Sequence, residues 1–234
     1  WNLRIDDLDI PRNCSGSVES FKKDLLWLGL NWDGPLIFQS HRRGLYRLAL
    51  AALRRQNKLY ACRCSRKEIL ENALNTDQKN SIYAGSCRSL RLSWGWHNER
   101  LPSLRLKVAN EFSNKCGDII LRRSDGYIAY NLATVVDDLT LGINEVVRGY
   151  DLKDSLPSQL ALIKELKQES LNYKHLPLLC DKYGQKLSKR KGGIGIKYLQ
   201  ENAIRAEDLV GQFASEFGLI PQGSKLSSKE LLSE

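Results

Sequence analysis

The sequence predicts an α/β fold in which a largely parallel sheet is interrupted by a polar insertion. Two observations lead to this fold class. Short apolar segments alternate with amphipathic helical ones toward both ends of the chain, a pattern typical of parallel sheets. The stretch between them is more polar and contains three of the six cysteines. We therefore predict a core in two parts, 1–59 and 119–200, an insertion at 60–118, and a C-terminal helix and tail at 201–234.

The first part of the core begins with a short strand at residues 2–5. Ser17 is expected to cap a helix that stops at Gly29, because serine favours the N-cap and glycine favours the position after a helix. A second helix is expected at about 41–56, with arginines on one side and an apolar face on the other. The residues predicted for that face are Leu45, Leu48, Ala52 and Leu53.

The insertion is predicted to contain a helix from about Ser65 and a half-buried strand at 104–108, where apolar and polar residues alternate. At the start of the second part of the core, the turn residues 124–126 separate two apolar runs, 119–121 and 128–130. A polar turn of this kind between apolar runs is a signal for a β-hairpin.

The rest of the core is predicted from the same alternation of strands and helices. Helices are expected at 132–141 and about 154–167, and strands at 146–147 and 176–180. A final helix covers about 205–217. The tail from residue 224 is rich in Ser, Lys and Glu and is expected to be partly frayed.

The composition describes an ordinary globular chain with a basic excess. Thirty-six Lys and Arg residues stand against 27 Asp and Glu, which gives a net charge of +9 and favours a polyanionic partner such as nucleic acid. No apolar run approaches the about 20 residues needed to cross a bilayer, so no membrane partner is expected. The chain has no methionine and opens on Trp1 inside a predicted strand, so we expect that a first strand of the core is missing before it.

The six cysteines do not form a convincing disulfide framework for a chain of 234 residues. This usage indicates a reducing, cytoplasmic location. Cys14, Cys116 and Cys180 have no partner pattern and are expected to be small buried or half-buried side chains.

The other three cysteines lie in the insertion. Cys62 and Cys64 are one residue apart, and Tyr83 and Cys87 follow. Three thiolates and one further ligand would complete a tetrahedral structural zinc site in a segment with little core of its own. Free buried cysteines remain the alternative, since Cys-x-Cys is less diagnostic than Cys-x-x-Cys.

A strongly basic loop follows the last predicted strand. Four cations lie among residues 186–191, around Ser188, and Gly192 and Gly193 come next. Lysine ammonium groups, a hydroxyl and close backbone approach suit a polyphosphate. The alternative is a solvated basic loop.

Arg148 and Tyr130 are further candidates for a binding site. Arg148 ends an apolar strand, where parallel sheets place ligand sites, and its guanidinium could hold a carboxylate with two hydrogen bonds. The alternatives are an ion-paired or surface arginine and a core tyrosine.

Several segments, in order along nearly the whole chain, resemble the catalytic core of the class I glutamyl-tRNA synthetases. They are 4–9, 32–34, 118–138, 146–151 and 186–190, the last resembling the KMSKS signature with leucine in place of methionine. Within this family the chain is most similar to the short paralogues without an anticodon-binding domain, the glutamyl-queuosine tRNA(Asp) synthetases. The early end of the chain after the basic loop and the Cys-x-Cys…Tyr-x-x-x-Cys arrangement support this subgroup.

The resemblance implies a Rossmann-type core, a zinc-bearing insertion and an ATP-dependent ligase reaction. L-glutamate and ATP, with Mg²⁺, would give glutamyl-adenylate and pyrophosphate, and the glutamate would pass to queuosine at the wobble position of tRNA(Asp). One structural Zn²⁺ per chain, a tRNA partner and a monomeric enzyme are also implied.

The resemblance further assigns residue roles. Arg148 would bind a substrate carboxylate, Tyr130 would line the amino-acid pocket and Asp6 would hold the substrate ammonium. Lys189 would contact the ATP phosphates, with Lys186 and Ser188 as catalytic neighbours. The full loop contacting ATP would be Lys186, Leu187, Ser188, Lys189 and Arg190, and the zinc ligands would be Cys62, Cys64, Tyr83 and Cys87.

Some features depart from the family pattern. Asp6 stands where the family usually has glutamate, and Ser158 stands in place of a usual arginine. The HIGH-type motif is absent from residues 1–234, so we expect these residues alone to be inactive. Two alternatives stay open: a truncated glutamyl-tRNA synthetase that charges the 3′ end of tRNA(Glu), and a catalytically dead paralogue that binds tRNA.

Overall fold

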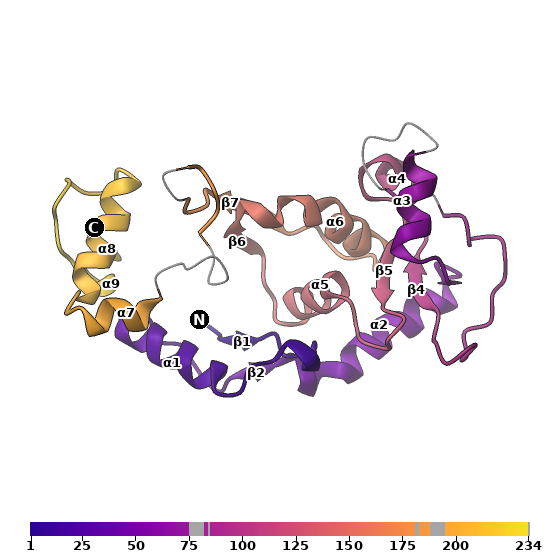
Figure 1. The fold of residues 1–234 in the computed structure, drawn as a ribbon, viewed down its shortest axis with the longest axis horizontal. Helices are drawn as coiled ribbons and strands as arrows, with labels where there is room; N and C mark the ends of the chain where they lie inside the picture. Colours follow the sequence, from indigo (N-terminus) through magenta and orange to yellow (C-terminus); the bar gives the residue numbers. More distant parts are fainter. Residues whose placement is uncertain (75–81, 84, 181–182, 188–194, 234) are drawn as a thin grey trace. The chain divides into compact units, whose positions relative to one another are not determined.

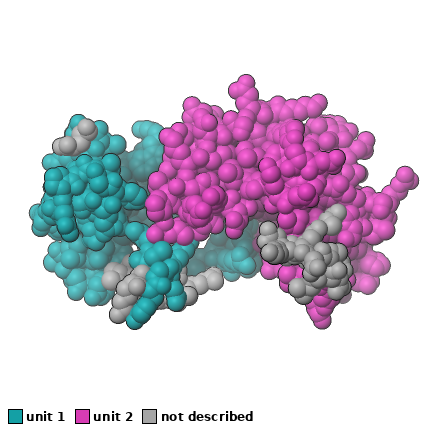
Figure 2. Space-filling model, turned by 90° about the horizontal axis from the view of Figure 1, so that it is seen from above, with its two compact units in different colours: residues 1–38, 179–234 teal, residues 39–178 magenta. Residues whose placement is uncertain are grey.

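The computed structural model describes residues 1–74, 82–83, 85–180, 183–187 and 195–233 (Figure 1). The chain divides into two compact units (Figure 2). Unit 1 combines residues 1–38 with 179–234, and unit 2 is the continuous segment 39–178. Each unit is described by itself below. The boundaries predicted at residues 60, 119 and 201 stay a prediction.

Unit 1 holds a small parallel strand pair and helices from both ends of the chain. In the pair, Arg4 is the register partner of Ile37, and Ile5 that of Phe38. The elements are β1 (Arg4–Ile5), the 3₁₀ helix η1 (Ile10–Arg12), α1 (Ser17–Trp27), β2 (Ile37–Phe38), α7 (Ile196–Glu201), α8 (Ala206–Glu216) and α9 (Ser228–Leu231).

The N-cap of helix α1 lies one residue before the position that the sequence predicts. Gly16 is the N-cap, in the left-handed conformation with φ of 76°, and Ser17 is the first helical residue. The prediction that Ser17 caps the helix is therefore wrong, because a left-handed cap suits glycine better than serine. Gly29, also left-handed, follows the end of the helix as expected.

The C-terminal segment is folded, which corrects the prediction of a frayed tail. Ser227 and Glu230 form a reciprocal capping box at the start of α9. The Ser228 hydroxyl donates to the carbonyl of Leu28, at 2.5 Å, and so ties the segment to the end of α1. A side chain at Gly211 in α8 would collide with the carbonyl of Ser224, 2.0 Å from an added Cβ.

Unit 2 contains an antiparallel sheet followed by a parallel strand pair. The antiparallel sheet has the order β3–β4–β5. The elements are the 3₁₀ helix η2 (Gln39–Arg42), α2 (Arg43–Arg55), β3 (Leu59–Cys62), α3 (Arg66–Leu74), β4 (Ser103–Leu106), α4 (Asn110–Cys116), β5 (Ile119–Arg122), α5 (Tyr130–Thr140), β6 (Glu145–Gly149), the 3₁₀ helix η3 (Tyr150–Ser155), α6 (Leu156–Glu165) and β7 (Asn172–Leu176).

Strands β6 and β7 with α6 between them form a β-α-β crossover, the unit that the alternating pattern predicts. The two strands are parallel, with Arg148 paired in register with His175 and Val146 with Tyr173. Because register partners share a face, these four side chains lie on one face of the pair. The two strands alternate between exposed and half-buried residues, and these four belong to the half-buried set.

The core of unit 2 is made by α2, α5, α6 and the antiparallel sheet. Its fully buried apolar residues include Leu53, Leu106, Leu121, Leu132 and Leu162. Along α2 the buried residues are Tyr46 and Leu53, whereas Leu48 is 66% exposed. Placing Leu48 on the buried face was wrong, because the buried hydroxyl of Tyr46, bonded to Asp137, belongs to the face that the helix turns inward.

Two strand predictions are also corrected. The hairpin is limited to a turn closed by Arg123 and Tyr127 and an isolated bridge between Arg122 and Ile128, because Tyr130 already begins α5. The last strand of unit 2 is Asn172–Leu176 instead of 176–180. Pro177 cannot donate a ladder hydrogen bond, which disfavours a strand there.

All six cysteines are free. Cys14 and Cys180 are exposed, so the expectation that they are buried or half-buried is wrong for these two; Cys116 is half-buried. Among the described residues, no helix is both long and apolar enough to cross a membrane.

Candidate metal centre and arginine network

Unit 2 positions two groups of chemically active side chains. The first is the cysteine cluster, defined as Cys62, Cys64, Tyr83 and Cys87. The second is the Arg148 network, defined as Arg148, Gln159, Tyr173 and His175.

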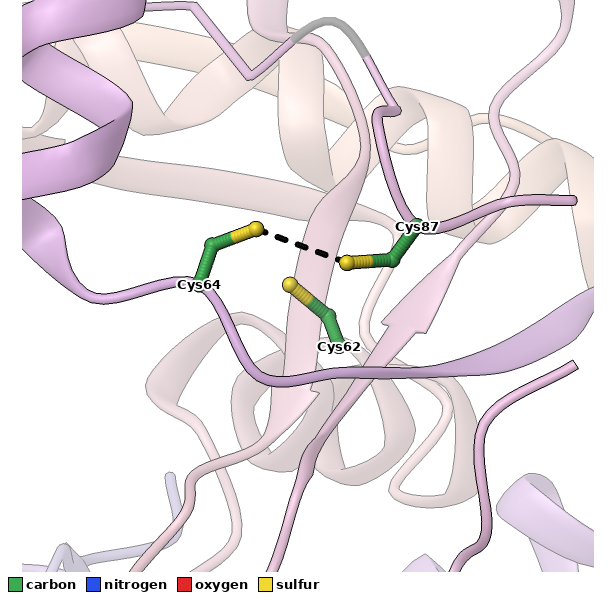
Figure 3. A group of neighbouring side chains, drawn as sticks. All are labelled: Cys62, Cys64 and Cys87. Atoms are coloured by element: carbon green, nitrogen blue, oxygen red, sulfur yellow. Dashed lines mark hydrogen bonds between the residues drawn. The ribbon is translucent and has the colours of Figure 1, made fainter. Parts of the chain in front are cut away.

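The cysteine cluster is brought together by the end of β3 and the turn that contains Cys87. The three thiols point toward one another (Figure 3), and their sulfur atoms all lie within 4.8 Å of one another. Cys64 Sγ lies 3.4 Å from Cys87 Sγ. The Tyr83 hydroxyl lies 3.4 Å from Cys62 Sγ and 3.6 Å from Cys64 Sγ.

These distances fit a tetrahedral metal ion. With zinc–sulfur bonds of about 2.3 Å, neighbouring ligand atoms of a tetrahedral site are about 3.8 Å apart. The observed distances of 3.4, 3.4 and 3.6 Å, with all three sulfurs within 4.8 Å of one another, are close to this value. Three sulfurs and one oxygen, two of the cysteines buried, are a donor set suited to zinc.

A polar shell holds the Tyr83–Cys87 turn in place. Asp118 accepts hydrogen bonds from the side chain of Arg88, next to Cys87, and from the hydroxyl of Tyr60. The guanidinium of Arg105 lies over the Tyr83 ring, 3.8 Å from its centroid. These contacts hold the Tyr83 ring and the residue next to Cys87 in place, and so orient Tyr83 and Cys87 toward the other cysteines.

Gly85 allows this turn to close tightly. Its φ is +88°, and an added Cβ would lie 2.7 Å from Nε of Arg88 and 2.9 Å from the Asp118 carboxylate. A larger residue here would push the Arg88–Asp118 pair away from Cys87.

The thiols differ in acidity. Burial raises the pKa of Cys64 to about 12, and the neighbouring thiols add to this rise. Burial also acts to raise the pKa of Cys87, but hydrogen bonds from Tyr83, from the backbone of Arg63 and from the other thiols outweigh it and lower the pKa. Burial raises the pKa of Tyr83, so its hydroxyl is the weakest donor of the four to a cation. A metal ion would release protons from the cluster.

The Arg148 network lies on the covered face of the β6–β7 pair. Arg148 Nε donates to His175 Nε2 at 3.1 Å, and Nη1 donates to Gln159 Oε1 at 2.6 Å. The guanidinium carbon lies 5.0 Å from the centroid of the Tyr173 ring. Gln159 comes from the first half of α6 and is 0% exposed. Strand register and helix packing thus fix the plane of the guanidinium.

Three buried polar atoms of this network have no hydrogen-bond partner among the residues the structure describes. They are Arg148 Nη2, Gln159 Nε2 and the Tyr173 hydroxyl. All three can donate. A buried donor left unpaired costs about 1–3 kcal/mol, so these three atoms are candidates for hydrogen bonds to a bound acceptor.

Two other residues, Tyr130 and Asp6, were predicted to bind the substrate glutamate. Tyr130 is the first residue of α5 and is 44% exposed, so it is not a core tyrosine. Asp6 belongs to unit 1, where Arg4 donates to both of its oxygens, at 2.7 and 3.3 Å. Asp6 therefore already forms an ion pair with a neighbour on its own segment.

The basic loop is described only in its first residues. Lys186 forms an antiparallel bridge with Cys180, and Leu187 N–H donates to the carbonyl of Leu179 at 2.9 Å. The chain thus doubles back on itself just before the loop. Ser188, Lys189 and Arg190 lie outside the described residues.

Sequence reasoning missed Gln159, Tyr173 and His175. A signal for two of them exists, since Tyr173 and His175 alternate with the polar residues Asn172 and Lys174. That two-residue period marks a half-buried strand. The contact with Gln159 has no such signal, because it depends on how α6 packs on the strands.

Comparisons with known proteins point to the same family over nearly the whole chain. Residues 1–225 match the model for the catalytic domain of class I tRNA synthetases for glutamate and glutamine (E and Q). A glutamyl-Q tRNA(Asp) synthetase of Prochlorococcus marinus (strain MIT 9313) is 55% identical over 234 residues, covering 100% of this chain and 76% of the relative. One from Dechloromonas aromatica (strain RCB) is 37% identical, covering 92% of this chain and 76% of the relative.

A solved structure shows the same fold. The glutamate-tRNA synthetase of Elizabethkingia anophelis superposes with a TM-score of 0.75 at 22% identity. The match covers 99% of this chain and 58% of that one.

Proposed function

Because the chain belongs to the glutamyl-Q tRNA(Asp) synthetases, within the class I tRNA synthetases for glutamate and glutamine, we propose that it activates L-glutamate with ATP and transfers it to queuosine in tRNA(Asp). The observation that carries this proposal is the 55% identity over all 234 residues to a relative of that name. The Arg148 network supports it, because its buried unpaired donors suit a carboxylate substrate.

In the first step, a glutamate carboxylate oxygen attacks the α-phosphate of ATP in line, the bond to the bridging oxygen breaks, and pyrophosphate leaves. The enzyme's contribution is positioning and charge stabilisation. Arg148 binds a substrate carboxylate through its free Nη2 donor. Tyr130, exposed at the start of α5, lines the amino-acid pocket. Asp6 receives the substrate ammonium while it keeps its contact to Arg4.

The basic loop acts on the nucleotide. Lys189, Lys186 and Ser188 contact the phosphates of ATP and its Mg²⁺ complex, within the segment that also includes Leu187 and Arg190. The antiparallel bridge at Lys186 and the hydrogen bond at Leu187 anchor the loop at its base. Point-charge ammonium groups suit a phosphate chain whose charge is redistributed during the reaction.

In the second step, a hydroxyl of the queuosine ring at the wobble position attacks the glutamyl carbonyl, and AMP leaves. The basic excess of the chain, a net charge of +9, meets the phosphate backbone of tRNA in a salt-sensitive way. The protein acts as a monomer in the cytoplasm, where tRNA is modified.

One Zn²⁺ per chain would be held by Cys62, Cys64, Tyr83 and Cys87. Its role would be structural, because it would cross-link the end of β3 to the turn that contains Cys87. The shell of Asp118, Arg88 and Arg105 keeps the ligands in place.

The test is to locate the transferred glutamate. The full-length protein is incubated with labelled glutamate, ATP and queuosine-containing tRNA(Asp), and the tRNA is digested to nucleosides. We expect the label on the queuosine nucleoside and none with tRNA that lacks queuosine. Label on the 3′ terminal adenosine would instead establish a conventional glutamyl-tRNA synthetase. tRNA binding without glutamate-dependent pyrophosphate exchange would establish a binding paralogue.

A further inference from the structure

We propose that Gln159 is a positioning residue for glutamate activation, because its uncharged amide oxygen holds the guanidinium of Arg148. In this proposal Gln159, Tyr173 and Arg148 together supply three hydrogen-bond donors to a substrate carboxylate. This inference rests on the proposed function. It adds Gln159 from α6 and Tyr173 from β7 to the predicted site, and it explains why these side chains keep unpaired donors.

The orientation of the Gln159 amide follows from its partner. A guanidinium only donates hydrogen bonds, so the amide oxygen must face Arg148, as observed at 2.6 Å from Nη1. The amide nitrogen then points elsewhere, and it is one of the buried donors without a partner. Gln159 therefore uses one end of its amide to hold Arg148 and keeps the other end for a further acceptor.

His175 holds the guanidinium by the same principle. Its Nε2 accepts from Arg148 Nε at 3.1 Å, so this nitrogen carries no proton and the ring is neutral with its proton on Nδ1. Strand pairing places the two residues opposite each other. Both side-chain acceptors of Arg148 are thus uncharged.

Two other partly buried arginines of unit 2, Arg42 and Arg88, each form an ion pair with a buried aspartate. Arg42 pairs with Asp137 at 2.7 Å, and Arg88 pairs with Asp118. Arg148 forms no ion pair with an acidic side chain in the part of the chain that the structure describes. Among the described residues, the hydrogen bonds of the Arg148 side chain go to His175 and Gln159, and its Nη2 keeps a donor for an incoming anion.

The chain contains a completed version of the same group. Around Asp137, one carboxylate accepts from Gln39 Nε2 at 2.9 Å, from Arg42 Nε at 2.7 Å and from the Tyr46 hydroxyl at 3.0 Å. Glutamine, arginine and tyrosine recur in the Arg148 network, where the carboxylate is missing. A substrate carboxylate supplies the acceptor that Asp137 supplies internally.

The test uses substitutions at Gln159 and steady-state glutamate-dependent pyrophosphate exchange by the full-length protein. Gln159→Glu keeps the size of the side chain but places an anion against Arg148, where it competes with the substrate. We expect KM for glutamate to rise at least about tenfold, with kcat changed less and thermal stability equal or higher. Gln159→Leu removes both hydrogen-bonding ends and is expected to raise KM as well.

A structural role alone gives a different result: Gln159→Glu would lower thermal stability and the active fraction and leave KM unchanged, which would overturn the inference. Gln168→Glu is the matched control, because it adds the same charge on the exposed residue just beyond α6. It should leave KM unchanged. Activity of the unsubstituted protein separates the two proposals, since its absence would refute the proposed function itself and not merely the role of Gln159.

Discussion

Two buried polar groups of unit 2 contain the same types of side chain, but only one of them includes a carboxylate that accepts their hydrogen bonds. In the Asp137 centre, defined as Gln39, Arg42, Tyr46 and Asp137, three donors surround a carboxylate that is 0% exposed. In the Arg148 network, Gln159, Arg148 and Tyr173 are present without an acidic partner, and each keeps an unpaired polar atom among the described residues. The hydrogen bonds of the first group are complete within the chain, and we propose that a ligand completes those of the second.

The difference shows how a stable fold can carry an incomplete site. A buried carboxylate with all its hydrogen bonds contributes to one well-defined packing of α2 against α5, whereas unpaired donors cost stability. The second group is tolerated because strand register and α6 already fix its members. The two groups therefore differ in hydrogen bonding: the Asp137 carboxylate is satisfied within the chain, whereas the Arg148 network keeps three unpaired buried atoms among the described residues.

The largest expected effect comes from breaking the complete group. Asp137→Ala leaves Arg42, Gln39 and the Tyr46 hydroxyl without their acceptor in the interior. We expect the free energy of unfolding to fall by about 3–5 kcal/mol, as for removal of one partner of a buried pair. Urea denaturation followed by circular dichroism measures this. KM for glutamate in the protein that remains folded should be unchanged, and a stability loss below about 1 kcal/mol would contradict the assignment.

Removing Arg148, the central residue of the Arg148 network, should affect activity more than stability. Arg148→Ala is expected to lower kcat/KM for glutamate by about 100- to 1,000-fold, which corresponds to about 3–4 kcal/mol of lost charge-assisted binding. The free energy of unfolding should fall by less than in Asp137→Ala, by about 1–3 kcal/mol, because the variant loses the hydrogen bonds of Arg148 to His175 and Gln159. Pyrophosphate exchange and thermal melts are measured side by side. Arg54→Ala, at the exposed end of α2, is the control and should affect neither KM nor kcat.

The cysteine cluster sharpens the comparison, because it would be a second group, beside the Arg148 network, that a ligand from outside completes. Cys64→Ser should abolish zinc binding, whereas Tyr83→Phe should weaken it by about 10- to 100-fold, since burial raises the pKa of that hydroxyl and makes it the weakest ligand. Metal content by mass spectrometry and competition with a chelator give both values. Exposed Cys14→Ser is the control. Equal zinc content in all three variants would remove the site.

The smallest effect concerns the unpaired hydroxyl of Tyr173. Burial, with a contribution from Asp138, raises the pKa of Tyr173 to about 12. The folded chain then holds this proton more strongly than the unfolded chain, so its stabilising contribution is complete below about pH 10 and is lost as the pH rises toward 12. For a half-buried group this amounts to less than about 1 kcal/mol.

Unfolding at pH 9 and pH 11 tests this prediction. The wild type should lose more stability between the two values than Tyr173→Phe, which has no proton to release there. Tyr183→Phe, at a 75% exposed tyrosine, should behave like the wild type. Identical losses for all three proteins would argue against a perturbed Tyr173.

Much of the fold could be predicted because the elements carry their own signals. The expected helices at 132–141 and 205–217 correspond to α5 (Tyr130–Thr140) and α8 (Ala206–Glu216) within two residues. The parallel pairing of β6 and β7 follows from the alternation of strands and helices. The β7 position was missed because its buried residues are the polar aromatics Tyr173 and His175, whereas the following apolar run contains Pro177.

The candidate sites divide in the same way. Cys62, Cys64 and Cys87 stood out as a cluster in the sequence, and the family resemblance added Tyr83; the structure brings the four side chains together. Arg148 stood out at the end of an apolar strand. Gln159 could not be found, because its contact with Arg148 depends on the register of two strands and on the rotation of α6, which are properties of tertiary packing.

The composition of unit 1 from both chain ends has a consequence for biosynthesis. Residues 1–38 leave the ribosome first, but their partners at 179–234 follow only after the whole of unit 2. At about 5–20 residues per second, the N-terminal segment waits roughly 10 to 30 seconds for the helices that complete its unit. Unit 2, continuous from 39 to 178, can fold during that interval.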